Sequence, residues 1–209
     1  MNRDEKFVIT ISRQFGTGGH EIGAVLAQRL GVKLLDKQIM NEVASKYGMV
    51  EEAVERIGSR NPLWRDDFTQ FYRQYMAGAE YNGQEHDQTS HQLFEAQVSA
   101  VRKIAAEESC VIIGRCGFYI FRDHPNAMKI FIHADDECRK QRIARRYDIS
   151  ESDAAAMIVD NDYSRELYTK TFTGMNWTDA RNYDVAINVR RFGVNGAVDF
   201  LMNCISPQE

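Results

Sequence analysis

Short apolar runs alternate with segments whose apolar residues have helical spacing. The apolar runs are residues 7–11, 32–35, 110–113, 129–133 and 185–189, and each has the length of a buried strand. Helical spacing is clearest over residues 22–30, 93–106 and 150–170. Ser150 stands where a side chain can cap the last of these helices. The alternation predicts an α/β fold, a three-layer sandwich with a mainly parallel five-stranded sheet.

A glycine-rich turn joins the first apolar run to the first helix. It reads Ser-Arg-Gln-Phe-Gly-Thr-Gly-Gly-His over residues 12–20. Glycines let consecutive N–H groups face a phosphate at the positive end of the helix dipole. When the P-loop pattern GxxxxGK[ST] is aligned here without gaps, three of its positions are changed. Arg13 replaces the first glycine, Gly19 replaces the lysine and His20 replaces the hydroxyl residue. The segment is either a phosphate loop without its lysine or an ordinary tight turn.

The loop and several later segments resemble the cytidylate kinase-like family. Residues 9–19 and the following Leu34-Leu35-Asp36 match the strand, loop and Leu-Leu-Asp of bacterial cytidylate kinases, which keep the lysine. Residues 93–97, 111–116, 129–134 and 182–184 extend the resemblance over most of residues 5–202. It implies a P-loop NTPase fold of the nucleoside monophosphate kinase type, with residues 1–209 as a single domain. It also implies ATP as the nucleotide donor, a small-molecule acceptor and Mg²⁺.

Residues 56–91 are the least core-like part of the chain. By resemblance they are an insertion that binds the acceptor. Aromatic residues at helical spacing within it predict a short helix with one aromatic face: Phe68, Phe71, Tyr72 and Tyr75. The alternative is an aromatic stripe packed on the core or on a second subunit, as in a homodimer, with a solvated loop from Ala79 to His91.

Basic residues near strand ends are the candidates for phosphoryl transfer. Arg115 follows the strand at 110–113, where a guanidinium fork suits a phosphate, although a surface ion pair is the alternative. Arg13 lies in the loop and either restores the charge of the missing lysine or points to solvent.

Residues 139–170 resemble the lid of a monophosphate kinase. Arg139, Arg142 and Arg146 share one helical face, which either meets a triphosphate or pairs with nearby carboxylates. Asp162 and Arg165 match part of the cytidylate kinase pattern RDxxDxxR. Its first arginine falls on Ile158, which weakens the case for cytidylate as the acceptor.

Four further polar residues lie close to these segments. Asp36 either orients the acceptor or the magnesium ion, or caps a helix that starts near Lys37. Gln97 lies on an apolar helix face and either reads a base edge or satisfies the backbone. Glu21 and His20 begin the first helix. The Glu21 carboxylate either binds the metal or stabilises the helix through its interaction with the positive end of the helix dipole.

These interpretations assign the candidate residues to three roles. Catalysis is assigned to Arg115, Asp36 and Arg165, and substrate binding to Gln97 and Asp162. Donor binding is assigned to Arg13, Gly16, Thr17, Gly18, Gly19, His20, Glu21 and Arg142. No metal ligand is assigned.

Composition limits the remaining classes of function. A chain of 209 residues that is 44% hydrophobic fits one well-buried domain. The net charge of −4 gives no reason to expect nucleic acid or an anionic membrane as a partner. Without an apolar run of transmembrane length, we expect a cytoplasmic protein. The four cysteines have neither CxxC spacing nor histidine partners, so we expect inert thiols.

Three hypotheses follow. The first is an ATP-dependent phosphotransferase that acts on a nucleoside monophosphate or another small acceptor. The second is a nucleotide-binding sensor or interaction module without phosphoryl transfer, which the missing lysine favours. The third, a nicotinamide-dependent oxidoreductase, is the weakest, because the fingerprint GxGxxG would need a glycine at Glu21.

Overall fold

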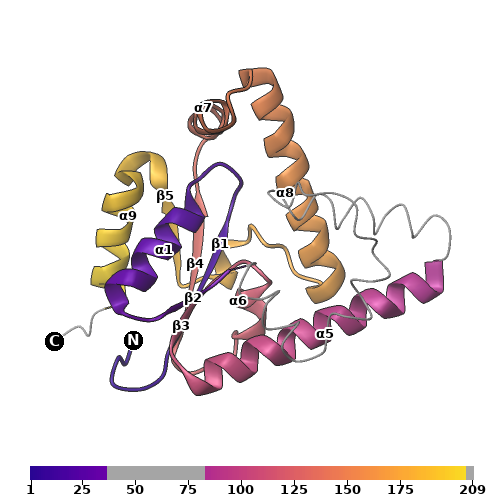
Figure 1. The fold of residues 1–209 in the computed structure, drawn as a ribbon, viewed down its shortest axis with the longest axis vertical. Coiled ribbons are helices and arrows are strands. Elements are labelled where there is room, and N and C mark those ends of the chain that lie inside the picture. Colours follow the sequence, from indigo (N-terminus) through magenta and orange to yellow (C-terminus); the bar gives the residue numbers. More distant parts are fainter. Residues whose placement is uncertain (37–82, 206–209) are drawn as a thin grey trace.

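A parallel five-stranded sheet forms the centre of the molecule (Figure 1). The computed structural model describes residues 1–36 and 83–205. The strands are β1 (Val8–Arg13), β2 (Lys33–Leu35), β3 (Cys110–Ile113), β4 (Ala127–His133) and β5 (Val185–Asn188). Their order is β2-β3-β1-β4-β5, and every neighbouring pair is parallel. The predicted strands and the predicted fold class are therefore confirmed.

Helices connect the strands and cover the sheet. They are α1 (Gly19–Leu30), α5 (Gly83–Glu107), α6 (Gly117–Ile120), α7 (Asp136–Tyr147), α8 (Glu151–Thr173) and α9 (Val189–Ile205), with a 3-10 turn η1 at Ala180–Asn182. In Figure 1, α1 and α9 lie on one side of the sheet, and α5 and α6 lie on the other. Because crossover helices cover both faces, the strands are apolar on both faces, which produces the continuous apolar runs of the sequence.

Strand β1 divides the core into two layers. Ile9 and Ile11 are fully buried in the cluster that also holds Leu26 of α1 and Leu201 of α9. Val8, which precedes Ile9, belongs to the cluster on the opposite face, with Val101 of α5. The alternation of side chains along a strand accounts for this division. Burial of β1 on both faces fixes its carboxyl end, where the glycine loop begins.

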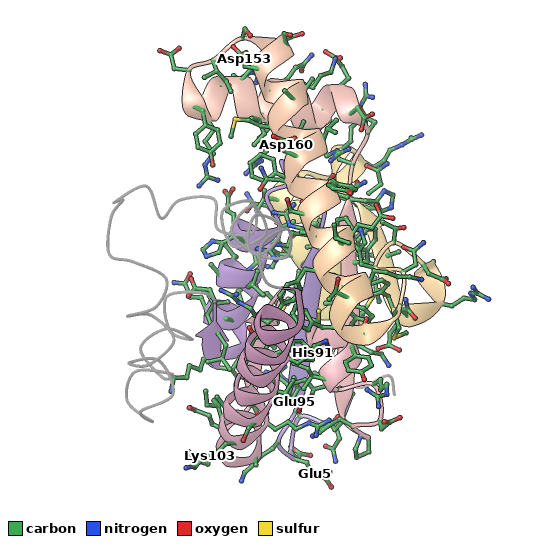
Figure 2. All side chains as sticks on the ribbon, turned by 90° about the vertical axis from the view of Figure 1, so that its right-hand side faces the viewer. Glu5, His91, Glu95, Lys103, Asp153 and Asp160 are labelled. Carbon is green, nitrogen blue, oxygen red and sulfur yellow. The ribbon has the colours of Figure 1, made fainter. Side chains whose placement is uncertain are left out.

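Helices α7 and α8 stand beyond the carboxyl edge of the sheet (Figure 1). They pack against each other around Ile143 and Ile158, and Phe15 from the glycine loop enters the same small cluster. Figure 2 shows α8 running from Asp153 past Asp160 toward α5. Near its end, Phe172 stacks on Phe94 of α5 with ring centroids 4.8 Å apart. Helix α8 therefore spans from the loop to the helix that covers β3.

The predicted helix at residues 93–106 begins earlier than expected. One alternative placed a solvated loop from Ala79 to His91, and this is wrong from Gly83 onward, where α5 is helical. A polar helical turn has no apolar period, so hydrophobic spacing could not detect it. Three expectations lie outside the described residues. They are the aromatic helix over residues 68–75, the helix from Lys37 that Asp36 would cap, and most of the insertion at residues 56–91.

None of the described helices is long and apolar enough to cross a membrane.

The expected cap of α8 is present, and it supplies a test of local stability. The Ser150 hydroxyl accepts the N–H of Asp153 at 3.0 Å. We expect Ser150→Ala to lower the free energy of unfolding by about 1 kcal/mol, because one N–H at the start of the helix loses its partner. Urea denaturation measures this change. The control Ser152→Ala replaces an exposed serine two residues further along; an equal loss in both variants would contradict the assignment.

Candidate functional site

The glycine loop leaves β1 and turns directly into α1. Gly16 and Gly18 have φ angles of 83° and 76°, in the left-handed region that favours glycine. Gln14 fixes the start of the loop to β4, because its N–H donates to the carbonyl of Ile132 at 3.0 Å. The Thr17 hydroxyl is buried and donates to the carbonyl of Gln14 at 2.8 Å. The loop is therefore held by the sheet edge and by its own hydrogen bonds.

The start of α1 presents backbone donors at the loop. Gly18 is the N-cap residue and has no side chain to accept a hydrogen bond from the first turn. The intrahelical ladder begins with the Ile22 N–H, which donates to the carbonyl of Gly18 at 3.0 Å. Unpaired N–H groups and the helix dipole make such an end favourable for an anion. The geometry thus agrees with a phosphate loop, and charged side chains complete it.

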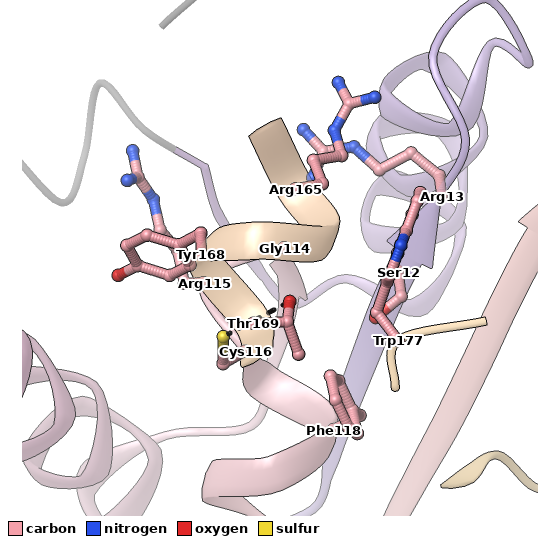
Figure 3. A pocket seen from close by; sticks show the side chains of 10 residues that line it. All are labelled: Ser12, Arg13, Gly114, Arg115, Cys116, Phe118, Arg165, Tyr168, Thr169 and Trp177. Carbon is pink, nitrogen blue, oxygen red and sulfur yellow. Dashed lines mark hydrogen bonds between the residues drawn. The ribbon is translucent and has the colours of Figure 1, made fainter. Parts of the chain in front are cut away.

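Three arginines from three elements gather at a pocket beside the loop (Figure 3). Arg13 ends β1, Arg115 follows β3 and Arg165 lies on α8. In Figure 3 their guanidinium groups point to the same side of the pocket, with those of Arg13 and Arg165 next to each other. The pocket is lined by Ser12, Arg13, Gly114, Arg115, Cys116, Phe118, Arg165, Tyr168, Thr169 and Trp177.

The other two arginines of the pocket disfavour the charge of Arg13. Burial, followed by the positive charges of Arg165 and Arg115, lowers the pKa of Arg13, and the Asp162 carboxylate opposes this. A guanidinium still keeps its proton at neutral pH, so the pocket carries persistent positive charge. An anion bound between these groups would offset their repulsion.

An unusual backbone presents Arg115. Gly114, Arg115 and Cys116 have φ angles of 72°, 58° and 53°, although only the first is a glycine. Non-glycine residues in this region cost about 1 kcal/mol or more each, and such strain clusters at functional sites. Two hydrogen bonds hold the turn: the Gly114 N–H donates to Ile11 at 2.9 Å, and the Gly117 N–H donates to Gly114 at 2.9 Å.

Gln97 supports Arg115 from α5. Its amide donates to the Arg115 carbonyl at 3.4 Å, and its side chain also interacts with the Tyr168 hydroxyl. Burial lowers the pKa of Arg115, while nearby Tyr168, Cys116 and Asp36 raise it. The structure therefore places Gln97 against the backbone beneath an arginine, which matches the second of the two expected roles.

Asp162 links the loop to both helices above it. Its Oδ1 accepts the Phe15 N–H at 2.8 Å and a hydrogen bond from Arg165 at 3.0 Å. Its Oδ2 pairs with Arg139, which also donates to the Phe15 carbonyl at 3.3 Å. The sequence assigned Asp162 to substrate binding, but in the structure both carboxylate oxygens bind protein groups.

The basic face expected on α7 is divided between different surroundings. Arg139 is buried and pairs with Asp136 at 2.5 Å as well as with Asp162. Arg142 pairs with Glu21 of α1 and lies against Gly18, where an added Cβ would come within 2.7 Å of its Nη2. The structure therefore brings two predicted donor-binding residues, Arg142 and Glu21, directly over the glycine loop.

His20 and Asp36 form a pair at the other side of the loop. His20 Nε2 lies 3.0 Å from Asp36 Oδ2, and the histidine is exposed while the carboxylate is mostly buried. The charge of Asp36 also reaches Arg115. The pair thus adjoins the arginine pocket from the side of β2.

Asp36 is the carboxylate that best fits a magnesium ion at this site. Within the part of the chain that the structure describes, no three His, Cys, Asp or Glu side chains gather to hold a metal. Magnesium in nucleotide sites uses one or two carboxylates and completes its shell with phosphate and water. A single carboxylate beside the loop is compatible with this chemistry. Asp36 pairs with a histidine, whereas the Glu21 carboxylate pairs with a guanidinium, which keeps its charge.

Sequence reasoning missed two features of the site. The link between Arg139 and Asp162 spans 23 residues, so no local pattern could indicate it. Tyr168, Thr169 and Trp177 line the pocket but were not assigned to it. Tyr168 lies three residues after Arg165, so helical spacing offered a signal that the two share one face.

The Asp162 carboxylate supplies a second test of stability. We expect Asp162→Asn to lower the free energy of unfolding by about 3 kcal/mol, because Arg139 stays buried without its main counter-charge. Guanidinium denaturation measures the loss. Glu166→Gln, an exposed change on the same helix, is the control and should stay within about 0.5 kcal/mol of the parent protein. Similar values for both variants would show that Asp162 does not hold the loop.

Comparisons with solved structures agree with this architecture. An uncharacterized protein from Eubacterium ventriosum matches with a TM-score of 0.71 at 25% identity, over 97% of this chain and 99% of that one. Shikimate kinase from Bacteroides thetaiotaomicron matches with a TM-score of 0.52 at 10% identity, over 95% of this chain and 98% of the kinase. At that identity the second likeness concerns the fold alone, a P-loop kinase fold.

Curated relatives extend the likeness to sequence. Cytidylate kinase from Archaeoglobus fulgidus is 25% identical over 209 residues, covering 96% of each chain. Cytidylate kinase from Methanopyrus kandleri is 24% identical over 210 residues, covering 96% of this chain and 93% of the relative. The model of the cytidylate kinase-like family matches residues 8–191, a range that includes all five described strands, the glycine loop and helices α7 and α8. The chain therefore belongs to the cytidylate kinase-like family.

Proposed function

We propose that the protein is an ATP-dependent phosphotransferase that acts on a nucleoside monophosphate, with cytidylate as the first acceptor to test. The observation that carries the proposal is the gathering of Arg13, Arg115 and Arg165 beside a glycine loop at the carboxyl end of β1. Ligands of parallel α/β sheets bind at this edge, where the strand order reverses. Here β1 lies between β3 and β4, so its loop is at that point.

The charge balance of the pocket favours a polyanionic ligand. Asp162 already pairs with Arg139 and Arg165, and it opposes only in part the effect of burial and of two neighbouring arginines on Arg13. The Arg13 side chain donates no hydrogen bond to any described residue. Phosphate groups accept paired hydrogen bonds from guanidinium forks and would neutralise this excess.

Phosphoryl transfer requires little covalent participation by the protein and depends on the positions of the reacting groups and on stabilisation of their charge. In the proposed arrangement the N–H groups at the start of α1 hold the donor phosphates. Arg115 and Arg165 contact the group in transfer, and Arg142 covers the loop from α7. Asp36, with His20 beside it, orients the acceptor or binds a magnesium ion through water. When bound, that ion would neutralise phosphate charge.

The family supports a kinase as the type of enzyme, and it does not name the acceptor. The two curated relatives are named cytidylate kinases, at 25% and 24% identity. The departure of Ile158 from the RDxxDxxR pattern bears on the acceptor, because the first arginine of that pattern is absent.

A nucleotide-binding module without transfer is the second candidate function. The observation that favours it is Gly19, which stands where a P-loop has its lysine. This candidate shares the loop and the arginines with the first and differs only in the chemistry that follows binding.

Calorimetric titration followed by a transfer assay tests the proposal. Purified protein is titrated with ATP and magnesium, and the same sample is then assayed for transfer to CMP, UMP, AMP and GMP. Binding with transfer supports the kinase and identifies its acceptor. Binding without transfer to any of the four favours the second candidate. Failure to bind ATP overturns both.

Arg115 supplies the matched mutational test. We expect Arg115→Ala to reduce the transfer rate by about 100-fold or more, the usual effect of removing one donor from a developing negative charge. The alanine keeps the same left-handed backbone cost, so thermal stability should change little. Arg122→Ala, which removes an exposed arginine that contacts Tyr119, is the control. Unchanged turnover in Arg115→Ala would remove Arg115 from the site.

A further inference from the structure

The side chain of Arg13 fills the space beside Gly19. A Cβ added to Gly19 would lie 2.7 Å from Arg13 Cβ and 2.8 Å from its Cγ, closer than real side chains approach. The Arg13 guanidinium then continues to the end of β3, where a Cβ on Gly114 would overlap its Nη1. The arginine stem thus runs between the start of α1 and the end of β3.

Gly19 is not required by its own backbone. Positive φ angles occur at Gly16, Gly18 and Gly114, but not at Gly19, the first residue of α1. A lysine could therefore adopt this conformation. The space taken by the Arg13 stem is what excludes a side chain here. The identities of residues 13 and 19 are consequently coupled by contact.

The two coupled positions depart from the P-loop pattern in opposite ways, because residue 13 gains a cation and residue 19 loses one. In GxxxxGK[ST], position 13 would be glycine and position 19 would be lysine. This chain has a cationic side chain at the first position and glycine at the second. We propose that the loop has moved its phosphate-binding cation: Arg13 takes the role of the P-loop lysine and binds the terminal phosphates of a nucleoside triphosphate.

The surroundings of Arg13 agree with this role. Arg139 and Arg165 pair with Asp162, whereas the Arg13 side chain donates no hydrogen bond to a described residue and lies near two like charges, which Asp162 opposes only in part. A structural arginine would be expected to have a paired carboxylate or carbonyl. A guanidinium also differs from an ammonium group in offering two parallel donors to a phosphate. The missing lysine is therefore not evidence against transfer. The identity of the ligand, a nucleoside triphosphate, rests on the proposed function, but the coupling of residues 13 and 19 does not.

A stability cycle tests the coupling without any ligand. Gly19→Ala is made in the parent protein and in Arg13→Gly, which removes the two atoms that a Cβ would meet. We expect the melting temperature to fall by about 2 °C or more further in the parent than in the Arg13→Gly background. Equal effects in both backgrounds would show that Arg13 does not exclude a side chain at residue 19. That result would overturn the proposal that the phosphate-binding cation has moved from residue 19 to residue 13.

Calorimetry with ATP and magnesium, and separately with tripolyphosphate, tests the ligand. We expect Arg13→Ala to weaken both affinities about tenfold or more, and Arg13→Lys to recover part of the loss. The double variant Arg13→Gly/Gly19→Lys should bind more tightly than Arg13→Gly, because it restores a cation at the usual P-loop position. Arg122→Ala is the control. Parent-like affinity in Arg13→Ala would overturn this inference alone, whereas a parent protein that binds neither probe would overturn the proposed function as well.

Discussion

The carboxylate of Asp162 joins three parts of the molecule that the chain keeps far apart. It accepts the Phe15 N–H from the glycine loop, pairs with Arg139 of α7 and pairs with Arg165 of its own helix α8. The loop cannot leave this arrangement without exposing Phe15 and leaving Arg139 buried without its main counter-charge. The position of the loop, and with it the direction of the backbone donors at the start of α1, depends on this one partly buried carboxylate.

The same carboxylate explains why the pocket remains positive. A single acidic group shared by Arg139 and Arg165 has little charge left for Arg13, and Arg115 approaches the pocket from β3. Arg13 is therefore a partly buried cation whose charge the described residues offset only in part. Such an arrangement is unfavourable in the absence of a ligand and becomes favourable when an anion binds. The proposed phosphotransferase function, and the proposed role of Arg13, both follow from this imbalance.

The sheet and most helices could be predicted because burial leaves a periodic trace in the sequence. The central strands β1 and β3 appear as continuous apolar runs because both of their faces are covered, and the shorter edge strands β2 and β5 keep enough apolar residues to be recognised. Ser150 indicates the start of α8 by local hydrogen-bonding chemistry. The first turns of α5 could not be predicted in this way, because the polar residues after Gly83 carry no apolar period. The glycine loop was recognisable because Gly16 and Gly18 mark a turn between a strand and a helix.

The sequence by itself determined the α/β class, the parallel sheet, the place of the loop and the family, because these depend on local periodicity and on short motifs. It placed Arg13, Arg115 and Arg165 near strand ends or in the lid, but it could not state their mutual distances. Only the tertiary structure decided that the three share one pocket, that Arg139 is buried on Asp162, and that the Arg13 stem occupies the space beside Gly19. These are contacts between residues distant in the chain or on different faces of the loop, and no sequence period records them.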